Sequence, residues 1–545
     1  MTDFRNGFGE SIFRHKYALT PEQTWAEKAQ DIVKDVTTNL MPPDMQEQLQ
    51  GYITNFQFLP GGRYIYYAGR RARFYNNCYL LKGEEDTREE WGNLVRRSSD
   101  CLMSGGGIGI DYSVFRPHGT KLGRTGGIAS GPIPLMHSIN EIGRNVMQGG
   151  SRRSAIYASL NWRHGDAEAF LSAKNWADQE ITDGVTYADA KKANFNNPAP
   201  LDQTNISLNY DDAFLDQVNQ GLIPPVFMQN CRQAMQTGEP GFSFNFGDKE
   251  QETLRNACTE VTSEDDSDVC NLGSINIGNI DSLDTFREVV RLAAGFLVCG
   301  TITADLPTKK IYAVRKKNRR LGLGLMGIHE WLLKRGYPYG MNPELRQWME
   351  VYREESERAA NSLCDRLSIS RPVAYRAIAP TGTIGILAGT TTGIEPLFAV
   401  AYKRRYLVGG SQWKYEYVID STAEDLIQRH GVNPDKIETS LSLVDDFERR
   451  LAFQADVQDY VDMAISSTIN MPSWGTEMNN EGRVEQFAKT LAKYAPRLRG
   501  FTVYPDGARG GQPLTLCSYQ EAKENEGMVF EENSEAVCAG GVCGI

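Results

Sequence analysis

A short segment near the middle of the chain carries three side chains of different chemistry. Asn256, Cys258 and Glu260 occupy alternate positions of the sequence NACTE. In an extended segment or a tight loop, alternate side chains face the same way, so the amide, the thiol and the carboxyl group could meet at one small ligand. Sulfur can carry a radical, a carboxylate can accept a hydroxyl proton and an amide can position a substrate. The pattern therefore favours hydrogen-atom chemistry, with a polar loop around a buried cysteine as the alternative.

Two further cysteines lie at the C-terminal end, in the sequence AVCAGGVCGI. Cys538 and Cys543 are separated by small residues, and glycine-rich segments are flexible and reach far. Two thiols on such a tail could exchange disulfides with a distant site and then meet an external reductant. The alternative is a disordered end whose cysteines have no role.

The remaining cysteines and the histidines predict no metal site. Ten cysteines are too few for a disulfide scaffold in a chain of this length, no CxxC occurs, and the six histidines form no HExxH. Four cysteines in helical-looking or apolar surroundings are expected to be small buried hydrophobes. These are Cys101, Cys231, Cys299 and Cys364.

Two glycine-containing segments could approach a ligand closely. Residues Gly322–Gly327 match GxGxxG, but the charged lead-in at 316–320 is not the apolar strand that a dinucleotide site requires, so we expect a role in helix packing. Residues Ala379–Gly385, APTGTIG, offer backbone N–H groups and two hydroxyls. This segment could hold a phosphate or form an ordinary turn.

The rest of the sequence predicts the elements that position these groups. Residues up to about 70 have a polar, helical pattern, and further amphipathic helices are predicted at 86–102 and 132–147. Residues 104–113, SGGGIGIDYS, predict a strand with a glycine-rich entry. Strand-like and helix-like segments then alternate to about residue 400, which is typical of an α/β architecture with parallel strands. One large catalytic domain fits better than several small ones.

Composition excludes several classes of protein. The 545 residues are 41% hydrophobic, which excludes a wholly disordered chain. The net charge of −11 argues against nucleic-acid binding, although a free nucleotide needs only a local cluster of donors. The best apolar stretch, 289–306, is too interrupted to cross a membrane, and no signal peptide is apparent at the N-terminus. We therefore expect a cytoplasmic protein without membrane contact.

Seven separated segments together resemble the catalytic subunits of ribonucleotide reductases, in the same order along the chain. The segments are NACTE, CNLGSIN, APTGTIG, SGGGIGID, GPIPLMHSINEIGRNVMQGGSRR, NRRLGLGLMG and the terminal cysteine pair. Three others, NNCYLL, GGIASGP and GFTVYPDGAR, look closest to the adenosylcobalamin-dependent class II, in a minimal form of a size that a phage could encode. The resemblance implies a ten-stranded α/β barrel at 58–525, with Cys258 on a central finger loop. A helical region without an ATP-binding module would precede it at 1–57, and a redox-active tail would follow at 526–545.

The resemblance also implies a role for each reactive side chain. Cys258 would act as a transient thiyl radical that removes the ribose 3′-hydrogen, while Glu260 accepts the 3′-hydroxyl proton and Asn256 binds the substrate hydroxyls. Cys78 and Cys270 would be the reducing pair. The substrate-binding residues would be Asn77, Gly106, Pro380, Thr381, Gly382, Thr383 and Ile384.

Two kinds of partner follow from the same resemblance. Cys538 and Cys543 would reduce the disulfide of the reducing pair and would themselves be reduced by a thioredoxin- or glutaredoxin-like protein. A deoxynucleotide effector would bind at the interface of a homodimer; the alternative is that the charged residues there are solvated. The effector-binding residues would be Asp86, Arg116, Lys121, Arg124, Gln148, Arg152 and Arg153.

One departure bears on how the radical is generated. The expected last barrel strand contains a single tyrosine in Thr502-Val503-Tyr504-Pro505, whereas members with a separate radical-generating subunit have two adjacent tyrosines there. We therefore expect a single-component, adenosylcobalamin-dependent enzyme. The short CxxxxC tail supports the alternative, a class I-like catalytic subunit that needs a separate metal-containing subunit.

Overall fold

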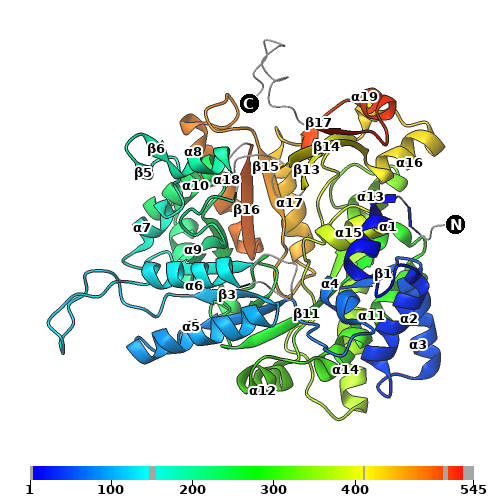
Figure 1. Cartoon of the computed structure of the whole chain (residues 1–545), viewed down its shortest axis with the longest axis horizontal. Coiled ribbons are helices and arrows are strands. Elements are labelled where there is room, and N and C mark those ends of the chain that lie inside the picture. The colour runs from blue at the N-terminus through cyan, green and yellow to red at the C-terminus, as the bar shows by residue number, and fades with distance from the viewer. Residues whose placement is uncertain are drawn as a thin grey trace.

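A large mixed sheet runs through the molecule, and most helices pack around it (Figure 1). The structure is a computed structural model. The residues that it describes are 4–5, 7–146, 155–194, 196–408, 412–506 and 514–531.

The strand order of the large sheet is β1-β11-β2-β3-β4-β7-β8-β16-β15, and β12 also pairs with β11. Strands β2, β3, β4, β7 and β8 are parallel to one another, as are β15 with β16 and β11 with β12. Antiparallel junctions, β2–β11 and β8–β16, join these groups. The α/β class is thus confirmed. The bounds are β1 (Phe58–Pro60), β2 (Cys78–Lys82), β3 (Gly107–Asp111), β4 (Ile156–Asn161), β7 (Thr204–Tyr210), β8 (Gly241–Phe244), β11 (Asp268–Asn276), β12 (Leu321–Met326), β15 (Thr468–Met471) and β16 (Gly500–Pro505).

Three smaller sheets complete the strands of the described residues. Two are the pairs β5 (Glu180–Thr182) with β6 (Val185–Thr186) and β9 (Leu254–Arg255) with β10 (Thr262–Ser263). The third has the order β17-β13-β14-β18 near the C-terminus. Its strands are β13 (Ala401–Val408), β14 (Gln412–Ile419), β17 (Leu514–Leu516) and β18 (Val529–Glu531).

The helices occupy the connections and the N-terminal region. In chain order they are α1 (Gly7–Ile12), the π-helix η1 (Phe13–Tyr17), α2 (Trp25–Thr37), α3 (Pro43–Thr54), α4 (Gly62–Tyr67), α5 (Arg88–Met103), α6 (Ile133–Asn145), α7 (Ala167–Ser172), α8 (Tyr187–Ala193), α9 (Asp212–Asn219), α10 (Pro225–Thr237), α11 (Leu283–Thr303), α12 (Lys309–Asn318), α13 (Ile328–Lys334), α14 (Pro343–Arg366), α15 (Gly382–Ala388), α16 (Ser421–His430), α17 (Phe447–Gln458), α18 (Val484–Tyr494) and α19 (Tyr519–Glu524). Short 3₁₀ turns are η2 (Gly247–Lys249), η3 (Ile277–Asn279), η4 (Pro434–Lys436), η5 (Glu481–Arg483) and η6 (Ala495–Arg497).

Local sequence explains the elements that border the catalytic segments. Helix α5 begins after Thr87, whose side chain accepts a hydrogen bond from the backbone N–H of Glu90, and it buries Leu94, Cys101 and Leu102. The predicted helices at 86–102 and 132–147 are therefore confirmed as α5 and α6, and the predicted strand after the glycines as β3. No helix of the described ranges combines the length and apolarity that crossing a membrane requires.

Two segments differ from the sequence prediction. The GxGxxG segment forms strand β12 instead of packing helices together. Its glycines allow close neighbours, because a Cβ on Gly324 would lie 2.6 Å from the carbonyl oxygen of Ala377. Strand β18 pairs with β14 although it lies within the expected tail, which was placed from residue 526 onward.

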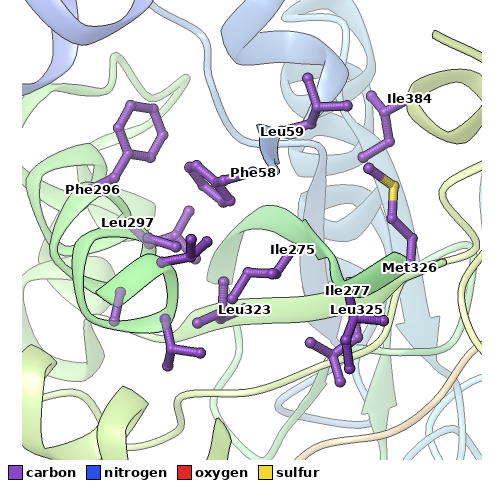
Figure 2. Close-up of a cluster of buried hydrophobic side chains, with 14 of the residues drawn as sticks. Phe58, Leu59, Ile275, Ile277, Phe296, Leu297, Leu323, Leu325, Met326 and Ile384 are labelled. Atoms are coloured by element: carbon purple, nitrogen blue, oxygen red, sulfur yellow. The ribbon is translucent and has the colours of Figure 1, made fainter. Parts of the chain in front are cut away.

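A hydrophobic cluster joins the sheet to the segment expected to bind phosphate. Leu59 of β1, Met326 of β12 and Ile384 of α15 belong to one buried cluster and lie close together in Figure 2. Such packing fixes the start of α15 against the sheet. The four cysteines expected to be buried, Cys101, Cys231, Cys299 and Cys364, are indeed fully buried.

Candidate active site

The NACTE segment forms the tip of a hairpin. Strands β9 and β10 pair antiparallel, with Arg255 opposite Thr262, and Cys258 lies in the turn between them. The turn is tight: the N–H of Thr259 donates to the carbonyl of Asn256 at 3.0 Å, and Thr259 has a φ of +72°. A β-branched residue rarely adopts this left-handed conformation, so the surrounding structure must hold the tip in place.

The base of the hairpin is anchored by a buried arginine. The Arg255 guanidinium donates to the side-chain oxygen of Asn245 at 2.6 Å and to the carbonyl of Arg499 at 3.2 Å. Burial lowers the pKa of Arg255 to about 9. The hairpin also passes directly over β3, where a Cβ on Gly109 would overlap the carbonyl group of Arg255. A glycine at this position therefore permits the close approach.

Asn256 and Glu260 are both buried beside the cysteine at the tip. The Asn256 amide nitrogen lies 3.5 Å from the Cys78 sulfur, and its oxygen accepts from the N–H of Val261 at 3.0 Å. The Glu260 oxygen Oε2 is buried and has no hydrogen-bond partner among the described residues. Burial raises the pKa of Glu260 to about 7, and a hydrogen bond from Asn256 opposes part of that rise. A carboxyl group with this pKa can exchange a proton near neutral pH.

Cys78 and Cys270, which are 192 positions apart in the sequence, are directly opposite each other in the sheet. They form a register pair at the antiparallel junction of β2 and β11. Opposite residues of antiparallel strands have Cβ atoms about 4.5–5.5 Å apart on one face, which suits exchange between two thiols and a disulfide. Both side chains are in the thiol form, and burial raises the pKa of Cys270 well above its ordinary value.

One cavity of about 230 Å³ brings these groups together with the glycine-containing loop. Its lining includes Cys258, Glu260 and Cys78, and Cys258 is partly exposed to it. The residues expected to bind substrate that line the cavity are Asn77, Pro380, Thr381, Gly382, Thr383 and Ile384. The Asn77 oxygen Oδ1 is buried without a hydrogen-bond partner in the described chain, so two orphaned polar atoms, this oxygen and Glu260 Oε2, belong to lining residues. Such atoms indicate a site for a polar ligand.

Gly106 is not one of the lining residues, whereas its neighbour Gly107 is. A Cβ on Gly107 would lie 2.9 Å from the carbonyl oxygen of Ala155. The glycine of the cavity wall is thus Gly107, one position after the Gly106 that the sequence indicated.

The sequence did not indicate the tyrosines and cations of the lining. These are Lys16, Tyr17, Arg63, Tyr66 and Tyr67. They precede the motifs that the sequence singled out, and their spacing carries no catalytic pattern. The only feature of the sequence that could have indicated them is that three of the five are tyrosines and two are cations.

Four of the residues expected to bind an effector lie in described parts of the chain, and none of these four lines the cavity. Asp86 and Arg116 form an ion pair at 2.6 Å, and both are partly exposed. Lys121 and Arg124 are exposed on a loop that projects from the molecule beyond β3 and α6 (Figure 1). Helices α5 and α6 pack against each other beside this loop.

Several expected site residues lie outside the described residues. They are Gln148, Arg152, Arg153, Cys538 and Cys543. Within the described ranges, no group of three or more His, Cys, Asp or Glu side chains is placed to hold a metal ion.

Comparison with known proteins gives consistent matches. The chain matches the family model described as "Ribonucleotide reductase, barrel domain" at residues 76–237, 227–361 and 371–504. A vitamin B12-dependent ribonucleoside-diphosphate reductase of Mycobacterium tuberculosis is 27% identical over 539 residues, covering 87% of this chain and 72% of the relative. A putative adenosylcobalamin-dependent ribonucleoside-triphosphate reductase of Mycobacterium phage D29 is 26% identical, covering 98% of both chains. A ribonucleoside-diphosphate reductase subunit alpha of Chlamydia muridarum is 26% identical over 53% of this chain.

Proposed function

Because the chain belongs to the ribonucleotide reductase family, whose barrel-domain model it matches over most of its length, we propose that it reduces ribonucleotides to 2′-deoxyribonucleotides. We further propose that it depends on adenosylcobalamin and needs no separate radical-generating subunit, as the names of its relatives suggest. One observation carries the proposal: Cys258, Glu260 and Cys78, with Cys270 opposite Cys78, converge on one cavity.

In the proposed reaction each group has one task. Cys258, as a thiyl radical, removes the 3′-hydrogen atom of the ribose, and the Glu260 carboxylate accepts the 3′-hydroxyl proton. The 2′-hydroxyl leaves as water with a proton from the reducing pair, and Cys78 and Cys270 in all supply two protons and two electrons and become a disulfide, while Glu260 returns its proton to the 3′-oxygen. The raised pKa of Cys270 keeps it protonated until that step. The 3′-hydrogen then returns from Cys258, so the net change is one ribonucleotide and two thiols to one deoxyribonucleotide, water and a disulfide.

The exposure of the cysteines fits a radical-generating cofactor. Cys258 is partly exposed to the cavity, whereas Cys78 and Cys270 are buried, so Cys258 is the thiol of the three that a bound group can approach most easily. Tyr66 and Tyr67 of α4 line the same cavity and would contact the bound cofactor. When bound, adenosylcobalamin supplies the one-electron chemistry that takes a hydrogen atom from a thiol.

We also infer that the large sheet closes into the family's ten-stranded barrel. Residues 374–378 form backbone hydrogen bonds with β12 along one edge and with residues 464–466 along the other. Leu321 donates to Ala374 at 2.9 Å, while Ser466 donates to Ile378 at 2.8 Å. Isolated parallel bridges join Leu323 with Arg376, and Ile378 with Ile465. This segment thus lies between β12 and the residues that lead into β15, where the tenth barrel strand would be.

The remaining roles of this proposal concern partners. Asp86, Arg116, Lys121 and Arg124 would bind a deoxynucleotide effector, with α5 and α6 facing a second copy of the chain. Gln148, Arg152 and Arg153 would connect that site to substrate choice. Cys538 and Cys543 would pass electrons from a thioredoxin-like protein of the cytoplasm to the Cys78–Cys270 disulfide.

The test is deoxynucleotide formation by the purified chain with dithiothreitol, an effector deoxynucleotide and adenosylcobalamin, beside a reaction without the cobalamin. We expect product only with cobalamin, and none from Cys258→Ser, since an alcohol O–H bond is too strong to replace the thiol. The variant should still bind nucleotide. Turnover by Cys258→Ser would remove that residue from the mechanism, and cobalamin-independent turnover would remove the cofactor.

A further inference from the structure

One wall of the cavity comes from the N-terminal segment, which precedes the residues matched by the family model. Lys16 and Tyr17 line the cavity and form the end of the π-helix η1. π-helical turns are rare and frequently occur at functional sites. In this turn Phe13 and Tyr17 are buried and anchor the backbone, while Lys16 is exposed and its Nζ lies 5.5 Å from the centroid of the Tyr17 ring.

The segment is held against the loop that lines the opposite part of the site. Phe13 packs edge-on against Trp25, with ring centroids 5.7 Å apart. Before η1, helix α1 lies beside α15, the helix that continues the 380–384 loop (Figure 1). Arg5 donates to the carbonyl of Gly389 at 3.0 Å and forms an ion pair with Glu330 at 2.6 Å. The N-terminal segment and the loop therefore form one packed unit.

The charges on the lining are unevenly distributed. Loop residues Pro380–Ile384 have no charged side chain, and Glu260 carries the acidic group of the cavity. The cations among the lining residues are Lys16 and Arg63. The Arg63 guanidinium donates from its three nitrogens to three backbone carbonyls at 2.6–2.9 Å and so stabilises the backbone of the cavity wall. A nucleoside di- or triphosphate has several negative charges, and lysine is a common phosphate ligand.

We propose that Lys16 binds the outer phosphates of the ribonucleotide, so that the N-terminal segment and the 380–384 loop hold the phosphates together. The identity of the ligand rests on the proposed function. That the cavity takes a polar ligand is supported separately by the orphaned buried oxygens of Asn77 and Glu260.

A glycine of the cavity controls where this segment lies. A Cβ on Gly62 would be 2.8 Å from the Tyr17 hydroxyl oxygen, closer than ordinary packing allows. Gly62→Ala should therefore displace Tyr17 and Lys16 without removing the charge.

The test is calorimetric titration of the full chain with cytidine 5′-mono-, di- and triphosphate. Lys16→Met should raise the Kd for the di- or triphosphate about tenfold and that for the monophosphate less, while Lys16→Arg stays near wild type. The matched control is Lys34→Met, an exposed cation on α2 away from the cavity. A parallel titration with adenosylcobalamin, which also contains a phosphate, should show no change.

An unchanged Kd for all three nucleotides in Lys16→Met, an equal loss for the monophosphate, or a loss confined to cobalamin would each overturn the proposal. If Lys16→Met unfolds at a lower temperature than wild type, the test rests on Gly62→Ala. Weaker di- or triphosphate binding by that variant supports the proposal, and unchanged binding overturns it. Binding does not require turnover. Failure to make deoxynucleotides would thus refute the proposed function alone, and normal binding by an active Lys16→Met enzyme would refute the role of Lys16 alone.

Discussion

Gly109→Ala should move the catalytic hairpin without changing any of its reactive side chains. The added Cβ would overlap the carbonyl oxygen of Arg255 and lie 2.7 Å from its carbonyl carbon. Non-bonded heavy atoms pack at about 3.5–4.0 Å, so the hairpin must retreat by at least about 1 Å. A misplacement of about 1 Å can cost about 100-fold in rate, and overpacking costs about 1–3 kcal/mol in stability. We expect the turnover number to fall about 100-fold, because Cys258 moves with the hairpin.

The assay is deoxynucleotide formation together with thermal unfolding of each variant. Gly51→Ala is the control, since a Cβ there meets nothing within 4 Å and alanine in helix α3 should raise stability by about 0.5–1 kcal/mol. Nucleotide affinity should change little in Gly109→Ala, because the 380–384 loop, which is the proposed phosphate site, is separate from β3. Wild-type turnover in a folded Gly109→Ala protein would refute the argument that hairpin position limits the reaction.

The remaining predictions concern protons and electrons. Turnover should fall as the pH drops through about 7, since Glu260 must be ionised to accept a proton, and Glu260→Gln should lose that pH dependence and about 10²–10⁴ in rate; a wild-type profile flat between pH 6 and 8 would contradict this. After one turnover of a Cys538→Ser, Cys543→Ser chain without reductant, peptide mass spectrometry should find Cys78 cross-linked to Cys270, and recovery of both as thiols after product formation would remove them as the electron source. A Cys538→Ser, Cys543→Ser double variant should stop thioredoxin-supported cycling yet make about one product per pre-reduced chain, and full cycling would exclude the tail.

Much of the fold could be predicted because its signals are local. The helix at 88–103 follows from a Thr87 cap and apolar spacing, and the strand at 107–111 from its glycine-rich apolar run. The GxGxxG segment was misassigned because glycines tolerated by close strand packing look the same in sequence as glycines that fit between helices.

The site depends on contacts that no local pattern contains. Cys78 and Cys270 are paired only by the register of β2 with β11, and the sequence could associate them only through family resemblance. Lys16 and Tyr17 enter the cavity because aromatic packing folds the N-terminal segment onto α15, a tertiary effect without a motif. By contrast, the NACTE spacing did single out Cys258 and Glu260, which line the cavity, whereas Asn256 is buried beside Cys78 and is not one of the lining residues.

The position of the reducing pair has a mechanical consequence. Strands β2 and β11 form one of the two antiparallel junctions between groups of parallel strands, so a bond between Cys78 and Cys270 would link the β11–β12 group covalently to the group that runs from β2 to β8. In the proposed cycle this disulfide forms with each product molecule and is broken at each reduction. The two strand groups should therefore separate less readily in the oxidised enzyme than in the reduced one. Amide hydrogen exchange along β2 and β11 should accordingly be slower in the oxidised enzyme.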